Sequence, residues 1–433
     1  MSRWSRREFL RNAAVLGAST ALLSRLERSA NAVTSPRPRM LVQFHLGGGI
    51  DAILTTNPKI KSEVGPTIDV PYAEGAIKTY GSTRVGPLFD VLGPYVPKMA
   101  IVNGVIGATV AHKTGNIQTL HMRRVCPSNG VGLVGTIGAL RGLDAPLDDI
   151  RFIGGGVMSP PTEILSTGRS LRVQSTQVDP AHGLLDRLAD LAKSDERRPI
   201  VLRALADELR HCGADNSCMP MEAAHALLEK MPHEALPPLT KILDDSTLEP
   251  LNRSFYARIA RQLEGVVRDL LHVLTHRLAP ATFVSIGHFD THSANLVGQT
   301  ERMKVFAPIF RYFLDELHRR RTADGVLLAD QVGIIMCSEL ERFPVLNQFD
   351  GKDHLPEFPV ILMGPGIRPG QYGETDHNMV GTPISLSSGH ASSRPSDSVP
   401  TLDDIGTTAL HWFGIEDARS LGYLGRRLDF LLG

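Results

Sequence analysis

Residues Ala281 to Asn295 read Ala-Thr-Phe-Val-Ser-Ile-Gly-His-Phe-Asp-Thr-His-Ser-Ala-Asn, an apolar segment that runs directly into polar side chains. Val284 and Ile286 flank Ser285 in a period of two and Phe283 continues the apolar run, which predicts a β-strand, and Gly287 permits a sharp exit from it. Asp290 and His292 would then lie just past the carboxyl end of the strand, where open α/β sheets hold their sites. A surface loop in which Asp290 caps the next segment explains the same residues without a site.

Three further segments have the same form, an apolar strand followed by glycine or polar residues. The segment Val332–Cys337 is almost continuously apolar, which indicates a central parallel strand, and it ends in Ser338-Glu339. Because the carboxyl ends of parallel strands meet at one edge, we expect the polar side chains to converge there. The other two are Met40–Leu46, followed by Gly-Gly-Gly-Ile-Asp51, and Met99–Val105, followed by a loop with Thr109, His112 and Thr114.

Helical patterns occupy most of the remaining chain. Apolar residues recur at three- and four-residue spacing between residues 184 and 278, in Glu301–Arg321 and in Leu402–Phe413. The first of these regions has little strand character. We therefore predict an α/β core formed by residues 33–125 and 279–433, with a largely helical insertion at 126–278.

The first 32 residues have the features of an export signal. Ser5-Arg6-Arg7-Glu8-Phe9-Leu10 precedes a short apolar run, and Ala30-Asn31-Ala32 has the form of a signal-peptidase site. These features predict a twin-arginine signal peptide at 1–32, the twin-arginine translocase as a partner during export, and a periplasmic or secreted protein. No later segment reaches the length of about 18 apolar residues that a membrane span requires, so no span is expected in the mature chain.

Composition excludes several classes of protein. The chain has 46 basic and 46 acidic residues, so no basic surface argues for nucleic-acid binding. With 42% apolar and 21% charged residues, it has ample material for a buried core and no signature of disorder.

Four cysteines are too few for a disulfide framework, and none form a Cys-x-x-Cys pair. Cys212 and Cys218 bracket the short segment Gly-Ala-Asp-Asn-Ser directly after a helical pattern, which predicts a local disulfide in an oxidising periplasm. Cys337 lies within an apolar strand and is predicted to be a small buried hydrophobe.

The candidate metal ligands are carboxylates and imidazoles in loops after or between strands. This ligand set suits zinc, manganese or calcium, and the lack of thiolate motifs disfavours iron–sulfur chemistry. Asp376-His377 and His390 could complete a second site, although a loop rich in glycine and serine explains them equally. The candidates for the main site are Asp51, Asp290, His292, Glu339, Asp353 and His354.

The order of these motifs resembles an exported bacterial family, domain of unknown function 1501, which is similar in its core to the alkaline phosphatase and sulfatase superfamily. The resemblance is carried by Arg-Arg-Glu-Phe-Leu near the start, Gly-Gly-x-Asp after the first strand, Asp-Thr-His-x-x-Asn at 290–295, Ser-Glu-x-x-Arg at 338–342 and Asp-His at 353–354. It implies an alkaline phosphatase-like three-layer core with a mostly parallel sheet. It also implies metal roles for the six candidates and places Asn295 and Arg342 near the substrate.

One departure from the family bears on catalysis. The family often has Ser-His-Phe after the second strand, where this chain has Ala111-His112-Lys113, so the usual serine nucleophile is missing. Thr109 or Thr114 could supply a hydroxyl activated by a metal, with His112 beside it. Both threonines are equally explained as helix caps.

Two functions follow as expectations. The first is a periplasmic, metal-dependent hydrolase of phosphate or sulfate esters, acting on a small molecule or a polysaccharide through a threonine or a metal-bound water. The second is a non-catalytic exported binding or assembly protein that keeps the fold and a stabilising metal, which the missing serine favours.

Overall fold

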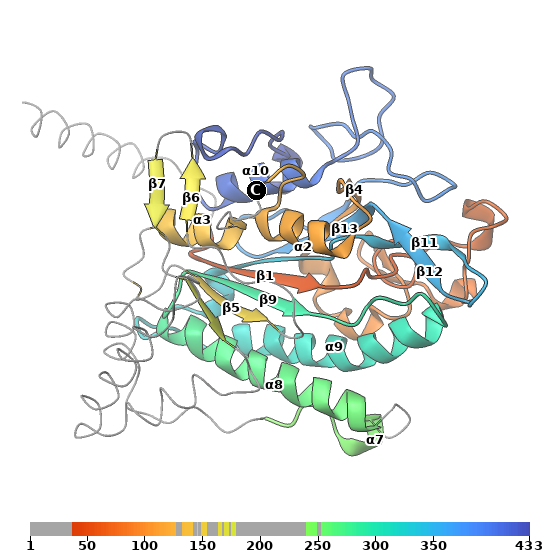
Figure 1. Cartoon of the computed structure of the whole chain (residues 1–433), viewed down its shortest axis with the longest axis horizontal. Helices are drawn as coiled ribbons and strands as arrows, with labels where there is room; N and C mark the ends of the chain where they lie inside the picture. Colours follow the sequence, from red (N-terminus) through yellow and green to blue (C-terminus); the bar gives the residue numbers. More distant parts are fainter. Residues whose placement is uncertain are drawn as a thin grey trace, which may run out of the picture. The chain divides into compact units, whose positions relative to one another are not determined.

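The computed structural model describes residues 37–126, 132–141, 145, 149–153, 163–166, 169–172, 175–178, 240–248 and 253–433. Its central element is an eight-stranded sheet in which only β13 runs antiparallel to its neighbours (Figure 1). The strand order is β14 (Gly370–Tyr372), β4 (Met99–Ile106), β13 (Glu357–Met363), β10 (Val332–Cys337), β1 (Met40–Leu46), β9 (Ala281–Ile286), β5 (Asp149–Ile153) and β8 (Ser175–Val178).

Helices cover both faces of the sheet, so the fold has three layers. Helices α8 (Arg253–His276) and α9 (Asn295–Leu317) lie on one face, and α2 (His112–His121), α3 (Gly132–Arg141) and α10 (Leu402–Trp412) lie on the other (Figure 1). The predicted α/β class with a mostly parallel sheet is confirmed.

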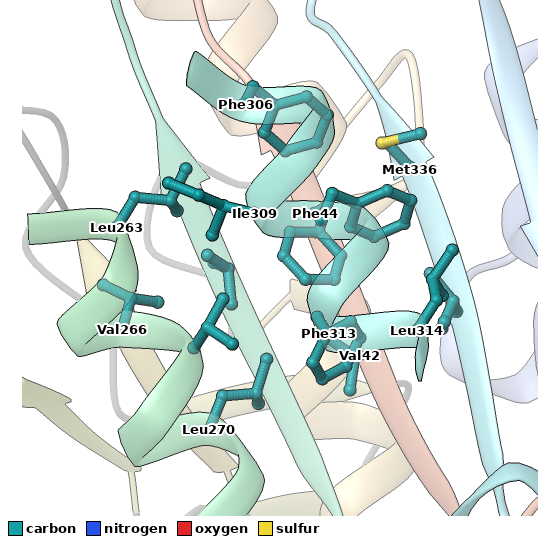
Figure 2. Close-up of a cluster of buried hydrophobic side chains, with 14 of the residues drawn as sticks. Val42, Phe44, Leu263, Val266, Leu270, Phe306, Ile309, Phe313, Leu314 and Met336 are labelled. Atoms are coloured by element: carbon teal, nitrogen blue, oxygen red, sulfur yellow. The ribbon is translucent and has the colours of Figure 1, made fainter. Parts of the chain in front are cut away.

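Five adjacent strands of the sheet contribute alternate side chains to two separate cores; they are β4, β13, β10, β1 and β9. On β1, Val42 and Phe44 face α8 and α9 (Figure 2). Leu41 belongs to the other core, on the α2–α10 side. The Phe44 ring contacts the rings of Phe310 and Phe313 edge to face, with centroids 5.1 and 5.5 Å apart. Fully burying a side chain of this size contributes about 1.5–3 kcal/mol, so these rings hold α9 firmly against the strand.

The strand boundaries agree closely with the expectations for Met40–Leu46, Ala281–Ile286 and Val332–Cys337. The sheet also includes β5 and β8, which lie within the range 126–278 that was assigned to a helical insertion, and α8 packs against α9 in the core. Part of the range 126–278 therefore belongs to the main α/β domain. Cys337 is fully buried, as predicted.

Two groups of predictions lie outside the described residues. The twin-arginine leader falls within residues 1–36, and the Cys212–Cys218 disulfide falls within 179–239. Both stay predictions. Among the described helices, none is long and apolar enough to cross a membrane.

Short elements complete the chain. A hairpin formed by β11 (Glu341–Leu346) and β12 (Lys352–Leu355) follows β10 directly and returns the chain to β13. It was not predicted, and it carries two of the candidate ligands. The remaining elements are β2 (Lys78–Tyr80), β3 (Thr83–Val85), β6 (Glu163–Ser166), β7 (Arg169–Arg172), α7 (Asp245–Leu248) and several single-turn helices.

Candidate metal centre

The candidate site lies at the edge of the sheet where β1, β4, β9 and β10 end. These four strands run in the same direction, so the loops after them meet at one place. Gly48 allows the loop after β1 to lie directly against the loop after β9. A Cβ at this position would lie 2.3 Å from the backbone nitrogen of Asp290, and the φ of +112° favours glycine. The glycine triplet thus serves both the turn and the packing of two site loops.

Four side chains converge at this edge: His112, Asp290, His292 and His354. Each offers one ligand atom, and the four atoms all lie within 4.8 Å of one another. His112 is the first residue of α2, Asp290 and His292 lie between β9 and α9, and His354 lies on β12. Three of them were predicted as ligands, whereas His112 was predicted as a catalytic residue.

The second nitrogen of each imidazole is held by an acceptor, which leaves Nε2 directed at the common centre. His112 Nδ1 donates to Glu339 Oε1 at 2.6 Å, and His354 Nδ1 donates to the carbonyl oxygen of Val110 at 2.6 Å. His292 Nδ1 lies 3.1 Å from Asp353 Oδ1. Metal-ligating histidines are typically oriented in this way, because the outer hydrogen bond selects the tautomer and fixes the ring.

The inward-facing atoms need a cation between them. His292 Nε2 and His354 Nε2 are 2.8 Å apart, and with both Nδ1 atoms protonated each would present a lone pair to the other. Among the described residues, the buried His112 Nε2 has no hydrogen-bond partner; Asp290 Oδ2 is 3.3 Å away but not aligned for one. A single proton could join only one pair of these atoms, whereas a divalent metal ion would accept a lone pair from each of them, and the donor set fits a metal.

The pKa values around the cluster follow from its contacts. The hydrogen bond to Glu339 raises the pKa of His112, whereas burial lowers the pKa of His354. The hydrogen bond from His292 lowers the pKa of Asp353, whose side chain is exposed. Asp353 therefore stays ionised and can hold the orientation of His292.

Glu339, predicted as a ligand, lies beneath the cluster rather than in it. Its Oε1 accepts from His112 Nδ1 and from the backbone N–H of Gly48, and its Oε2 lies 3.0 Å from both His45 Nε2 and Ser338 Oγ. Burial raises its pKa, but the hydrogen bonds from the two histidines outweigh burial and hold the pKa well below its ordinary value. Glu339 is thus a buried carboxylate that supports His112.

Asp51 also lies outside the cluster, in a buried ion pair. Lys352 Nζ is 2.8 Å from Asp51 Oδ2 and 3.3 Å from Asp69 Oδ2, and both Lys352 and Asp51 are almost fully buried. Asn295 Nδ2 donates to the same Oδ2 at 2.8 Å. The internal ammonium group therefore supplies the positive charge that the sequence analysis assigned to a metal at Asp51.

The other predicted catalytic residues occupy different surroundings. Arg342 is fully buried and donates to Asp290 Oδ1 at 2.9 Å and to the backbone oxygens of Gly48 and Lys352, so it fixes the Asp290 carboxylate. Asn295 is fully buried and accepts from Thr291 Oγ1, which makes it part of the support. Thr109 accepts from the N–H of Ala111, as a turn residue does, and Thr114 is exposed on α2.

Part of the chain, from within α8 to near the C-terminus, matches a known family. Residues 271–430 match the family described as protein of unknown function DUF1501. This match confirms the predicted resemblance for the segment that holds the motifs at 290–295, 338–342 and 353–354. The DUF1501 segment contains Asp290, His292 and His354, whereas His112 lies before it.

Comparisons beyond the DUF1501 family give distant similarity. The lipoteichoic acid synthase LtaP from Listeria monocytogenes is 10% identical, with 91% of this chain and 76% of that chain covered and a TM-score of 0.41. A protein in the alkaline phosphatase superfamily from Vibrio parahaemolyticus is 9% identical, with coverages of 92% and 73% and a TM-score of 0.39. Lipooligosaccharide phosphoethanolamine transferase A from Neisseria meningitidis is 11% identical, with coverages of 98% and 67% and a TM-score of 0.39. A comparison with curated proteins gives no match.

Three residues at the site were missed as functional residues by sequence reasoning. His45 was taken as structural, and Lys352 and Asn347, which donates to the backbone oxygen of His292, were not considered. The available signal for His45 was an ionisable residue inside a largely apolar strand. No comparable signal marks Lys352, because its partners are about 300 residues away in the sequence.

The buried Glu341 gives a pH-dependent prediction. Burial, followed by the charges of Asp51 and Glu357, raises its pKa well above the ordinary value. A carboxyl whose pKa is higher in the folded than in the unfolded state stabilises the fold at low pH, and this contribution is lost as the pH rises through the folded-state pKa. We therefore expect Glu341→Gln to raise the free energy of unfolding at pH 8 and to change it little at pH 4.

Urea denaturation of both proteins at the two pH values measures the effect of Glu341→Gln. The pH 4 comparison is the internal control, because the wild-type side chain is then neutral as well. An equal effect at both pH values would show that Glu341 carries no such linkage.

Proposed function

We propose that this protein binds one zinc-type divalent ion through His112, Asp290, His292 and His354, and that it is an exported hydrolase of phosphate or sulfate esters. The observation that carries the proposal is the convergence of three Nε2 atoms and one carboxylate, each with its outer atom already held. The position of the cluster supports it too, because the site loops follow the carboxyl ends of parallel strands, where open α/β sheets hold their sites.

The donor set narrows the choice of metal. Three imidazoles and a carboxylate suit zinc or another transition ion that prefers nitrogen, whereas calcium takes six to eight oxygen ligands. Calcium, one of the three expected metals, is therefore the least compatible with these residues.

The solvent exposure of the cluster favours a catalytic metal site over a structural metal site that is closed to solvent. The side chains of Asp290 and His292 are 42% and 47% exposed, so water and an ester reach the ligand atoms. A bound divalent ion would polarise an ester oxygen and bring the pKa of a bound water toward neutrality. Around it, Arg342 and Glu339 hold Asp290 and His112 in place, and burial keeps the Nε2 of His354 unprotonated.

Water, rather than a side chain, is the attacking group in this proposal. Ala111, the N-cap of α2, has no hydroxyl, and neither Thr109 nor Thr114 has a described contact with the cluster. Activation of water then requires only the ligands and their supports.

A specific observation favours the second candidate, a non-catalytic protein with a stabilising metal. Four protein ligands are the full set of a structural zinc site, whereas catalytic zinc sites commonly have three and an open position. In that case the metal would hold the loops after β4 and β9 against the β11–β12 hairpin, from which the ligands come.

One experiment separates the two functions. Protein purified from the periplasm is analysed for metal and assayed on a panel of aryl phosphate and aryl sulfate esters, before and after chelation and after zinc is restored. Turnover that disappears with the metal and returns with it supports the hydrolase. Bound metal and a melting temperature that falls on chelation, without turnover of any ester, select the second function, and protein without metal rejects both.

A further inference from the structure

Beneath the metal cluster, a buried row of side chains runs back into the sheet through His45. His45 is the sixth residue of β1 and is 2% exposed, and its register partner on β9 is Ser285. Its Nε2 lies 3.0 Å from Glu339 Oε2, and its Nδ1 lies 3.3 Å from Ser285 Oγ. Glu339 in turn accepts from His112 Nδ1 at 2.6 Å.

The direction of the protons follows from the acceptors. An ionised carboxylate only accepts, so both His45 Nε2 and His112 Nδ1 must donate to Glu339. Ser338 is the other neighbour of Oε2, but its single hydroxyl proton has a closer acceptor in the backbone oxygen of Leu46, at 2.6 Å against 3.0 Å. The N–H of Gly49 donates to Ser338 Oγ, so His45 is the principal donor to Oε2.

We propose that His45 is a positioning residue for the metal centre: by donating to Glu339 it holds the carboxylate that fixes His112 as an Nε2 ligand. Without the donor, a buried carboxylate oxygen loses its hydrogen bond, and Glu339 rotates or takes up water or a proton. The hydrogen bond that selects the His112 tautomer is then weakened, and Nε2 is no longer held toward Asp290 and His354. The proposal rests on the metal site proposed above.

Two substitutions at position 45 separate a donor from a space-filling side chain. His45→Leu fills the same space with an apolar side chain of similar size and removes the hydrogen-bond donor. His45→Gln restores an N–H at a position close to that of Nε2. Removing an outer partner of a metal ligand typically costs 10–100-fold in affinity, and we expect about 10-fold for His45→Leu, one step further out, with His45→Gln within about 3-fold of wild type.

Gln43 provides a matched control on the same strand. It lies two residues before His45, is fully buried, and donates to the backbone oxygen of Thr119 on α2. Gln43→Leu therefore removes a buried hydrogen bond between β1 and the helix that carries His112, without touching Glu339. We expect its zinc affinity to equal that of wild type.

Zinc affinity is measured by competition with a chromogenic chelator. The tautomer of His112 is measured from the ¹⁵N spectrum of its ring in metal-free protein, and the His112→Gln variant assigns the His112 signals. We expect Nδ1–H to be retained in wild type, His45→Gln and Gln43→Leu, and lost or mixed in His45→Leu. Unchanged His112 tautomer and zinc affinity in His45→Leu, or an equal fall in affinity in Gln43→Leu, would overturn the positioning role. The ring spectrum needs no metal, so a wild type that binds no zinc rejects the proposed function and leaves the tautomer result to decide the role of His45.

Discussion

The double variant Asp290→Ala, His292→Ala is expected to lose about four orders of magnitude in zinc affinity. Structural zinc sites with four ligands bind with roughly 10–16 kcal/mol, which is about 3 kcal/mol for each ligand and about 6 kcal/mol for two. Each 1.4 kcal/mol corresponds to a factor of ten in affinity. Isothermal titration or chelator competition on metal-free protein measures the loss.

The loop at 376–377 provides the control for this variant. Asp376 and His377 have the same side chains, and both lie outside the four-residue cluster. Asp376→Ala, His377→Ala should therefore retain wild-type affinity. Retained affinity in the Asp290 and His292 variant would place the metal elsewhere, and equal loss in both variants would indicate a general effect on the fold.

Lys352→Met is expected to lower the free energy of unfolding by about 3–5 kcal/mol. The Lys352 ammonium group is completely buried between Asp51 and Asp69, and its removal leaves the buried Asp51 carboxylate without a counter-charge. Burial alone would lower the pKa of Lys352, but the charge and hydrogen bond of Asp51 raise it, so the lysine is charged in the wild type. Urea denaturation of metal-free protein measures the change without a contribution from ligand binding.

An exposed pair and a double variant test the cause of this destabilisation. Arg84 pairs with Glu63 at 2.9 Å on the surface, and Arg84→Met should cost less than about 1 kcal/mol. Lys352→Met combined with Asp51→Asn should recover part of the loss, because no buried charge remains unpaired. A loss that is as large in the double variant as in Lys352→Met would assign the effect to packing around the lysine stem.

The core of the fold and three of the four residues of the candidate metal cluster were within reach of sequence reasoning. The apolar runs at Met40–Leu46, Ala281–Ile286 and Val332–Cys337 are local patterns, and the structure gives the same bounds. Asp290 and His292 follow a strand directly, so their place at its carboxyl end is also a local property. The range 126–278 was harder, because β5 and β8 are short and their pairing with the sheet is not local.

The roles of Asp51, Glu339 and His112 depended on distant partners. All three follow strands, and Asp51 and Glu339 were predicted as ligands, whereas His112 was predicted as a catalytic residue. In the structure Asp51 is paired with Lys352 from the hairpin, and Glu339 is enclosed by His45, Gly48 and His112. These two carboxylates are buried, while the Nε2 of His112 remains available to the cluster.

The sequence by itself determined the strands, the edge of the sheet at which polar residues gather, and the chemical types of ligand present. These follow from periodicity and from residues adjacent in the chain. Only the tertiary structure decided that Asp290 faces the candidate cluster, whereas Asp51 and Glu339 are neutralised in the interior. That decision depends on the charges and hydrogen-bond donors that distant segments bring within about 3 Å, where the low local dielectric makes a single buried lysine or histidine decisive.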